Sequence, residues 1–412
     1  MRIGEFAARF DLNISTVRYY VNNSLLIPKR KNGQYFFDKQ CVRDMETILR
    51  LKNYYFTIDE IQLFMFLEKT SRFKDDVILE LCREILEKKK SELIRQRNSI
   101  DECITEIDSE IDTLPVVEPD TGGAKGIPFS FIPNLYCPHC NEPLKLDSAS
   151  ISDGYLNSGE LWCGCGYRAR IDNGILICEG SLEGTPLKSF ENIETVLAMR
   201  DQFSPRYRSL IEKTYSYMYN RILKGEDEQR FILTGPLQLN FLLSFIEKLG
   251  KNNVYIVVDP SIKKLEKMHT YLNETGCNIV YMAGTMDEIP VRNNSVDIYV
   301  DDYCLANCIF TKNEFNAKRI YGLLKRKGIV TGIFGNYAKA PRSLSRFSEF
   351  DKDFDPKKMS LNNFKTIWRT AGFNIRELKS AGFTSEREKD YEQDVLGEQL
   401  EVLGYYAEKE KR

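Results

Sequence analysis

The residues of this 412-residue chain that are best suited to chemistry are four cysteines arranged in two short pairs. Cys137 and Cys140 enclose two residues, and Cys163 and Cys165 enclose one. Thiolates at such spacings are typical ligands of a tetrahedral zinc site, which is structural when the protein fills all four positions. The opposing interpretation is four unligated thiols. We predict one structural zinc ion, because a segment this small cannot bury enough core without a metal.

Residues at predicted strand ends in the second half of the chain form another candidate site, which would bind a cofactor or an effector. They are Gly235, Asp259, Thr285, Asp287, Asp301, Asp302 and Tyr303. Ligands of open α/β sheets bind beyond the carboxyl ends of the strands, where such residues meet. Asp259 is the candidate for a ribose hydroxyl, with an ordinary strand-end acid as the equal alternative. The acids at 301 and 302 would meet a cationic ligand or lie in solvent, and no residue is assigned a catalytic role.

The first 40 residues contain a third candidate site, suited to nucleic acid. Residues 3–10 have the pattern of a short amphipathic helix, and Ser15 or Thr16 can cap a second helix after a turn. A basic run followed by Asn-Gly at 32–33 predicts a two-stranded wing. A helix–turn–helix of this kind lays its second helix in a DNA major groove. The candidate DNA contacts are Thr16, Arg18, Tyr19, Tyr20, Lys29, Arg30, Lys31 and Tyr35.

These first residues resemble the N-terminal domain of the MerR family of transcription regulators. The resemblance rests on IGEFA at 3–7, TVRYY at 16–20, LLIP at 25–28, Asn-Gly at 32–33 and FTIDEI at 56–61. It implies a winged helix–turn–helix that binds double-stranded promoter DNA, with RNA polymerase as a partner at the promoter. The family wing usually carries an arginine where this chain has Tyr35, so one charge-assisted phosphate contact is missing here.

Residues 74–114 predict one long helix with a coiled-coil seam. Leucine and isoleucine recur every seven residues from Leu79 to Leu114, with Ile104 and Ile111 at the complementary offset. We expect a homodimer, because this stripe needs cover and a winged helix that binds half a palindrome needs a twofold partner. Packing against the chain's own later domains is the alternative. The MerR resemblance implies an antiparallel dimer helix at this place.

The remaining residues, 181–412, predict a doubly wound α/β domain that follows a helical lead-in. Strands are expected at 231–233, 254–258, 279–281, 296–300 and 329–334, alternating with helices. The charged tail after Thr384 predicts a helix, with Leu396, Leu400 and Leu403 as its apolar stripe.

Two further resemblances concern residues 131–412. YCPHCNEPL at 136–144 and IDNGI at 171–175 resemble the zinc ribbon beside many methyltransferases, including ribosomal RNA guanine methyltransferases. Asp259, NSVD at 294–297 and LLKRKG at 323–328 resemble class I S-adenosylmethionine-dependent methyltransferases, which implies a Rossmann-type fold and that cofactor. The loop TGPLQL at 234–239 retains one glycine, and Thr285 stands where an acid is usual, which argues against catalysis.

The chain is therefore expected to be multidomain. The predicted parts are a winged helix–turn–helix over 1–73, a coiled-coil helix over 74–114, a linker over 115–130, a zinc ribbon over 131–180 and a methyltransferase-like α/β domain over 181–412. Residues 1–56 hold ten Lys and Arg against five Asp and Glu, the surplus that phosphate contacts need. Eleven cysteines without a secretory signal or membrane-length apolar run predict a reducing, cytoplasmic location and no membrane partner.

Two classes of function fit these features. The first is a MerR-type transcription regulator that binds and distorts a promoter as a dimer, with the C-terminal region sensing an unknown small-molecule effector. The second is an active or S-adenosylmethionine-binding methyltransferase, acting on a small molecule or RNA, with an autoregulatory DNA-binding domain. We favour the first because the loop at 234–239 is eroded; binding of the cofactor and its turnover would discriminate between them.

Overall fold

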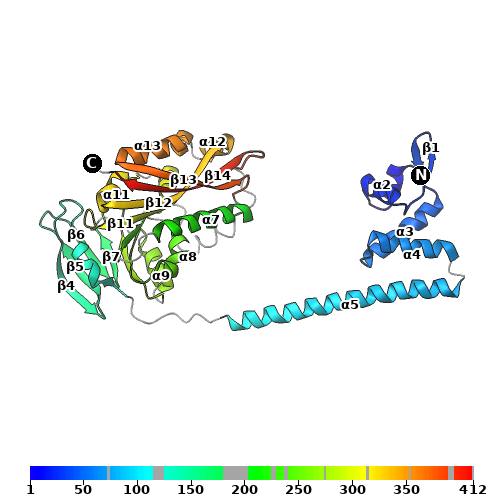
Figure 1. Cartoon of the computed structure of the whole chain (residues 1–412), viewed down its shortest axis with the longest axis horizontal. Coiled ribbons are helices and arrows are strands. Elements are labelled where there is room, and N and C mark those ends of the chain that lie inside the picture. The colour runs from blue at the N-terminus through cyan, green and yellow to red at the C-terminus, as the bar shows by residue number, and fades with distance from the viewer. Residues whose placement is uncertain are drawn as a thin grey trace. The chain divides into compact units, whose positions relative to one another are not determined.

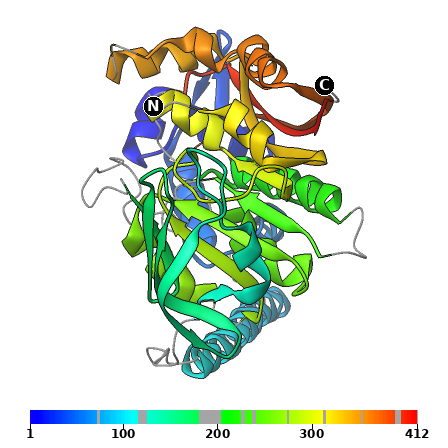
Figure 2. The same cartoon turned by 90° about the vertical axis from the view of Figure 1, so that its left-hand side faces the viewer.

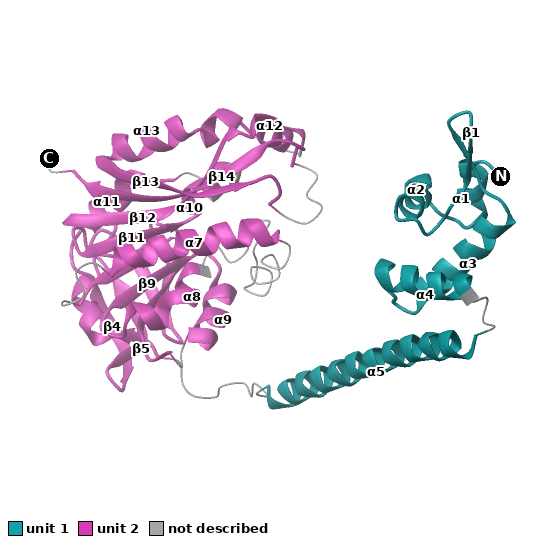
Figure 3. Cartoon of the chain, turned by 45° about the vertical axis from the view of Figure 1, so that its right-hand side comes forward, with its two compact units in different colours: residues 1–119 teal, residues 120–412 magenta. Residues whose placement is uncertain are grey.

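The computed structural model of the protein divides the chain into two compact units, residues 1–119 and 120–412, each with its own hydrophobic core (Figure 3). The described residues are 1–71, 75–114, 125–179, 203–223, 229–235, 240–272, 275–311, 315–350, 352, 354–387 and 394–410. Among them, no helix has both the length and the apolar character needed to cross a membrane. Most of the predicted linker lies outside these residues.

The first unit has the predicted winged helix–turn–helix. Its elements are α1 (Ile3–Arg9), α2 (Ile14–Asn22), the wing strands β1 (Lys29–Lys31) and β2 (Gln34–Phe36), α3 (Lys39–Asn53), α4 (Ile58–Ser71) and α5 (Asp76–Thr113) (Figure 1). Asn32 and Gly33 both have positive φ, 50° and 76°, as the tight Asn-Gly hairpin turn requires. Asp38 caps α3 by accepting hydrogen bonds from the backbone N–H groups of Gln40 and Cys41.

The predicted long helix is present as α5, and its first half packs on the winged domain. Lys89 is 6% exposed, and its Nζ lies 2.8 Å from Glu60 and 2.9 Å from Glu92. The same Nζ lies 5.3 Å from the ring centroid of Phe56. Glu60 also caps the start of α4 by accepting from the N–H of Thr57 at 2.7 Å. One buried lysine therefore joins α5 to the first turn of α4.

The second unit is organised around a twelve-stranded sheet in the order β13-β14-β12-β11-β8-β9-β10-β7-β6-β5-β3, with β4 paired to β5. The α/β strands are β8 (Phe231–Thr234), β9 (Val254–Asp259), β10 (Asn278–Ala283), β11 (Val296–Asp302), β12 (Leu324–Lys339), β13 (Phe373–Thr384) and β14 (Gln399–Lys409). The ribbon strands are β3 (Ile127–Pro128), β4 (Lys145–Ser152), β5 (Tyr155–Trp162), β6 (Arg168–Asp172) and β7 (Ile175–Cys178). All five strands predicted for the α/β domain are present.

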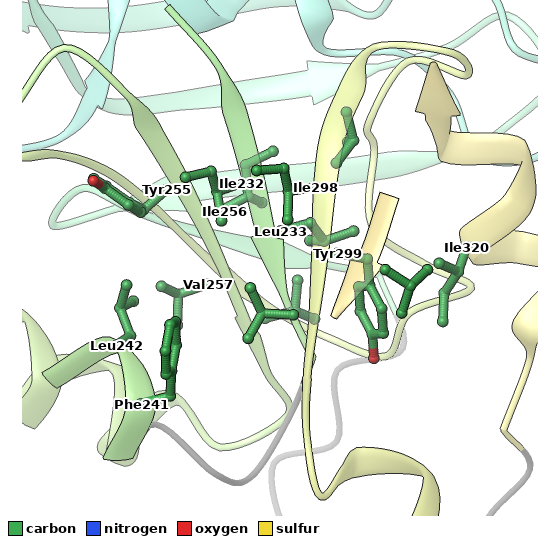
Figure 4. Close-up of a cluster of buried hydrophobic side chains, with 14 of the residues drawn as sticks. Ile232, Leu233, Phe241, Leu242, Tyr255, Ile256, Val257, Ile298, Tyr299 and Ile320 are labelled. Atoms are coloured by element: carbon green, nitrogen blue, oxygen red, sulfur yellow. The ribbon is translucent and has the colours of Figure 1, made fainter. Parts of the chain in front are cut away.

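Helices cover both faces of the α/β sheet, as in a doubly wound fold (Figure 1). They are α7 (Pro205–Ile222), α8 (Asn240–Leu249), α9 (Ile262–Leu272), α10 (Cys304–Thr311), α11 (Ala317–Leu323), α12 (Pro341–Phe350) and α13 (Leu361–Ala371), with short 3-10 turns at Phe129–Asn134 and Pro356–Met359. Phe241 and Leu242 of α8 lie on one side of β8 and β9, and Ile320 of α11 lies beside Tyr299 of β11 (Figure 4).

The predicted helix in the tail is wrong, because residues 399–409 form the strand β14. β14 is antiparallel to both of its neighbours, β12 and β13. Leu400, Val402, Leu403, Tyr405 and Ala407 are buried, since a central strand is covered on both faces and reads as a nearly continuous apolar run. Such a run has no clear period of two, so the leucine spacing suggested a helix.

The ribbon strands continue the α/β sheet. β7 pairs in parallel with β10, with Tyr281 opposite Ile175 and Ala283 opposite Ile177. Figure 2 looks at this end of the unit, where the ribbon strands lie beside the strands of the α/β sheet. The described part of the predicted zinc ribbon, residues 131–179, therefore shares one sheet and one core with the α/β strands, although the sequence suggested a separate small domain. The strand β3, at Ile127–Pro128, also lies inside the predicted linker.

Candidate metal centre, strand-edge site and nucleic-acid interface

Most predicted DNA contacts lie on exposed positions of α2 and β1. Arg18, Lys29, Arg30 and Lys31 are exposed, Tyr19 is 50% exposed and Thr16 is half-buried. Tyr20 is only 6% exposed and belongs to the core of the first unit, so the structure contradicts its assignment as a DNA contact. The physical reason is helical spacing, because Val17 and Tyr20 are three residues apart and share the buried face of α2.

Tyr35, the residue at the usual arginine position of the wing, is directly opposite Arg30 in the hairpin. The Arg30 guanidinium lies 5.9 Å from the centroid of the Tyr35 ring. A cation over an aromatic face gains about 0.5–1 kcal/mol at an exposed site. The Tyr35 ring therefore gives Arg30 a weak additional contact between the two wing strands, a role that sequence reasoning did not anticipate.

The four predicted metal ligands come together. Cys137 and Cys140 form a knuckle after the turn at Phe129–Asn134, and Cys163 and Cys165 form another between β5 and β6. Their four Sγ atoms lie within 4.8 Å of one another. The Sγ atoms of Cys137 and Cys165 are 3.4 Å apart, as are those of Cys140 and Cys163. A tetrahedral ion with metal–sulfur bonds of about 2.3 Å needs sulfurs roughly 3.8 Å apart, so the four thiols fit a metal ion with small adjustments.

The second knuckle is a tight backbone turn whose N–H groups lie close to its cysteines. Gly166 has φ 104°, in the left-handed region that a glycine adopts without strain. The N–H of Cys163 donates to the carbonyl of Tyr167 at 2.9 Å, which closes the turn. The N–H of Tyr167 lowers the pKa of the Cys165 thiol to about 6, with a further contribution from Cys137. Two other thiols shift the opposite way: burial raises the pKa of Cys137, and although the N–H of Glu142 lowers the pKa of Cys140, the hydrogen bond with Cys163 and burial raise it to about 12. Since metals bind thiolates, a cation must displace protons from these thiols when it binds.

Asp259, the predicted ribose ligand, is engaged inside the protein. It ends β9, is 1% exposed and lies 2.7 Å from Nζ of Lys264 in α9. Its other carboxylate oxygen accepts from the N–H of Ser261 at 2.9 Å. Lys264 is fully buried, and the sequence analysis missed it. The signal was available, because Lys264 shares the buried face of α9 with Leu265 and Met268.

The paired acids after β11 are also satisfied internally. Asp301 accepts from the hydroxyl of Tyr405 at 2.5 Å and from the N–H of Leu305 at 3.1 Å. Asp302 accepts from the hydroxyl of Tyr215 at 2.9 Å and from the N–H of Phe241 at 3.2 Å. Both are at most 4% exposed, so solvent exposure, one of the two alternatives predicted for this pair, is wrong. Burial raises the pKa of Asp301 to about 6.

The space beside Gly235 is filled by neighbouring side chains. A Cβ at this position would lie 2.5 Å from the hydroxyl of Tyr299 and 2.6 Å from Sγ of Cys304, so packing requires glycine. Tyr303, which has φ 63°, is half-buried, and its hydroxyl lies 3.0 Å from that of Tyr207. The other residues of the eroded loop, 236–239, lie outside the described residues.

Thr285 and Asp287 are exposed on the segment that follows β10. The N–H and hydroxyl of Thr285 donate to the Glu288 carboxylate at 2.9 and 2.8 Å. Asp287 accepts from the side-chain amide of Asn316 at 2.7 Å. Of the predicted strand-edge residues, Gly235, Asp301 and Tyr303 therefore lie around the ends of β8 and β11, whereas Thr285 and Asp287 belong to the loop beyond β10.

Comparison with known proteins identifies the N-terminal domain. Residues 1–66 match the family described as MerR HTH family regulatory protein. No curated protein sequence matches the chain significantly. The first unit therefore carries a MerR-type helix–turn–helix, which agrees with the resemblance in its motifs.

Solved structures similar to this chain include several methyltransferases. The YcgJ protein from Bacillus subtilis is 13% identical, with a TM-score of 0.34, covering 48% of this chain and 100% of that one. Geranyl diphosphate C-methyltransferase from Streptomyces coelicolor, solved with Mg²⁺, geranyl-S-thiolodiphosphate and S-adenosyl-L-homocysteine, is 9% identical, with a TM-score of 0.35, covering 47% of this chain and 76% of that one. Identities this low carry no information about activity.

The buried pair of Lys264 and Asp259 makes a prediction about stability. Lys264→Met should lower the free energy of unfolding of the second unit by about 3–5 kcal/mol, because it leaves a buried carboxylate without its counterion. Asp259→Asn combined with Lys264→Met should recover most of this loss. Both tryptophans, Trp162 and Trp368, belong to the second unit, so tryptophan fluorescence during urea unfolding reports on it.

The matched control for this substitution is Lys263→Met, which removes the neighbouring, exposed lysine of the same helix. It should leave the midpoint of unfolding unchanged. If Lys264→Met unfolds at the same urea concentration as Lys263→Met, the ion pair does not stabilise the unit.

Proposed function

We propose that this protein is a transcription regulator that binds promoter DNA as a homodimer, and that its second unit senses a ligand. The observation that carries the proposal is the MerR-type helix–turn–helix over residues 1–66, with basic side chains exposed on α2 and the wing. Such a module places its second helix in the major groove and its wing against the phosphate backbone. In this arrangement Arg18 contacts a base edge or phosphate, and Lys29, Arg30 and Lys31 contact the backbone.

The charge distribution along α5 supports the dimer. Residues 83–97 hold six Lys and Arg against three Asp and Glu, whereas residues 98–113 hold six Asp and Glu and no Lys or Arg. The apolar seam is exposed in the acidic half, with Ile100, Ile104, Ile107 and Ile111 each at least half exposed. An antiparallel pair of α5 helices covers this seam and places each acidic half against the basic half of the second copy.

A groove on the first unit fits the same arrangement. It has a volume of about 380 Å³ and is lined by Tyr54, Phe56, Leu86, Lys89, Lys90, Leu93, Ile94 and Arg97. Its floor is apolar and its rim carries positive charge. The acidic, isoleucine-rich half of α5 from a second copy has the complementary surface, so we propose that it lies there.

The second unit acts as the sensor in this proposal. The four cysteines hold one structural zinc ion, which fixes the two knuckles. The strand-edge acids are occupied by the protein's own donors, which favours an effector domain over an enzyme that uses Asp259 to bind a ribose. An unknown small-molecule effector shifts the promoter between two conformations only if it binds one state of the protein more tightly than the other. RNA polymerase is the partner that would respond to that change.

The DNA-binding role makes a prediction about Arg18. Arg18→Ala should weaken binding to an operator selected from random duplexes by about 1–3 kcal/mol, because it removes a charged contact from the exposed face of α2. Fluorescence anisotropy at fixed salt measures the affinity. Arg170→Ala removes an exposed arginine from β6 in the second unit and serves as the control. Equal affinities of the two variants would contradict the role of Arg18.

The dimer makes a prediction about the seam of α5. Ile104→Asp combined with Ile111→Asp should raise the dissociation constant of the dimer at least about tenfold, since burying two charges in an apolar seam costs more than about 1.4 kcal/mol. Light scattering after size-exclusion chromatography measures the mass at several concentrations. Thr105→Asp with Ser109→Asp adds the same charge off the seam and should remain dimeric. A monomeric wild-type protein at tens of micromolar would contradict the proposal.

The occupied Asp259 makes a prediction about S-adenosylmethionine. Calorimetric titration of the full chain with S-adenosylmethionine and S-adenosylhomocysteine should give dissociation constants weaker than about 1 mM, because the carboxylate that would bind a ribose is paired with Lys264. Tight binding would instead favour the alternative, a cofactor-binding or active methyltransferase. A methyl-transfer assay on small-molecule and RNA substrates would then separate those two.

A further inference from the structure

Both cysteine knuckles are attached to one segment of the α/β domain, residues 284–294, which lies between β10 and β11. The first knuckle makes the larger share of these contacts. The N–H of Tyr136, next to Cys137, donates to the carbonyl of Pro290 at 3.1 Å, and the N–H of Arg292 donates to the carbonyl of Asn134 at 2.9 Å. Between these bonds, Leu135 and Val291 form an antiparallel bridge. The chain leading into the first two ligands is thus hydrogen-bonded to the segment as a short ladder.

The second knuckle reaches the same segment through Tyr167. This residue lies two positions after Cys165 and is 2% exposed. Its carbonyl accepts from the N–H of Cys163 at 2.9 Å, which closes the knuckle, and its hydroxyl donates to the carbonyl of Glu288 at 2.9 Å. His139 of the first knuckle packs edge-on against the Tyr167 ring at 5.4 Å. One tyrosine therefore contacts both knuckles and the segment.

The other side of the segment carries the exposed residues of the candidate ligand site. The Glu288 carboxylate holds Thr285, and Asn316 holds Asp287, as described above. Arg319 of α11 donates to the carbonyl of Ile289 at 3.1 Å and to the side chain of Asn293 at 2.9 Å. The segment thus lies between the metal knuckles and α11, and it presents Thr285 and Asp287 beyond the end of β10.

We propose that metal occupancy of the four cysteines sets the conformation of residues 284–294, so that a thiolate-binding divalent cation is itself a signal to the sensor unit. Without a cation, the four thiols have no shared ligand that ties the two knuckles together, so the knuckles lose their geometry. The ladder at 134–136 and the Tyr167 hydroxyl then lose their fixed positions. The proposal rests on metal binding by the cysteines and deepens the sensing role proposed above.

The effect is local because the ribbon has a second attachment to the sheet. β7 remains paired with β10, and β5 and β6 remain paired with each other, through backbone hydrogen bonds that do not involve the cysteines. Metal release therefore loosens the knuckles and residues 284–294 while the sheet persists. By linkage, if bound metal raises the affinity of the segment for a ligand by some factor, that ligand raises the affinity of the cysteines for the metal by the same factor.

Hydrogen–deuterium exchange of the full chain tests the proposal. Native mass spectrometry first establishes one zinc ion per chain and its removal by a chelator. On removal, exchange of peptides covering 134–141 and 288–293 should accelerate at least about tenfold, because both lose their fixed geometry. Peptides from the interior of β12 and β14 should exchange at unchanged rates.

A conservative variant separates metal binding from the effect of the metal on residues 284–294. Tyr167→Phe keeps the four cysteines and the ring that packs against His139, but it removes the bond to Glu288. It should retain one zinc ion per chain and show faster exchange at 288–290 in the zinc-loaded state. Tyr155→Phe, which removes a hydroxyl bonded to Asn278 at 3.3 Å elsewhere in the unit, is the matched control and should behave as wild type.

Three results would overturn the inference. If the chain binds no zinc, the proposed signal does not exist. If exchange at 288–293 is the same with and without zinc, metal binding does not affect the segment. Acceleration throughout β12 and β14 would mean that the metal supports folding of the whole unit and has no local effect. None of these results bears on the DNA affinity of the Arg18 variant, so failure of this inference is distinguishable from failure of the proposed function.

Discussion

Three buried carboxylates constrain the ligand edge of the α/β sheet. Asp259, Asp301 and Asp302 end β9 and β11, and an unpaired charge at such depth would cost several kcal/mol. Donors from several elements meet this demand: Lys264 of α9, Tyr215 of α7, the backbone of α8 and α10, and Tyr405 of β14. The placement of these helices and of the last strand is thus tied to a single electrostatic requirement. An edge that receives external ligands in many α/β proteins is satisfied here mainly from within.

The two units solve different physical problems. The first presents charge outward, and on its wing the Tyr35 ring lies near one of these charges, Arg30. The second turns polar groups inward, where hydroxyls donate hydrogen bonds to buried acids, as Tyr405 does to Asp301, and Lys264 neutralises Asp259. Lys89 is an exception in the first unit, because it is a buried cation that joins α5 to α4. Any movement of α5 relative to α4 must break or carry this ion pair, so the orientation of the long helix and that of the winged domain are coupled.

Sequence patterns correctly predicted the features that depend on interactions between residues close together in the chain. The Asn-Gly turn, the long helix, the five parallel strands and the grouping of four cysteines all follow from spacing and composition. The errors arose where tertiary context decides. Tyr20 directly follows the exposed Tyr19 in the sequence, but the next position on the helix faces the core and is buried. The leucines of the tail suggested a helix because a strand covered on both faces loses its alternation. Lys264 escaped notice because a lysine on an apolar helix face matters only when a carboxylate lies opposite, and that neighbour comes from another strand.

The parallel pairing of β7 with β10 has a consequence for how the protein can be divided. In the intact chain, the ribbon strands occupy the hydrogen-bonding edge of β10. A fragment that starts after residue 180 would expose that edge, whose residues Ile279 to Ala283 are all buried and mostly apolar. An uncharged, open strand edge of this kind recruits other chains and leads to aggregation. The ribbon thus covers this edge of the sheet, and we expect the α/β region to aggregate when it is produced without the ribbon.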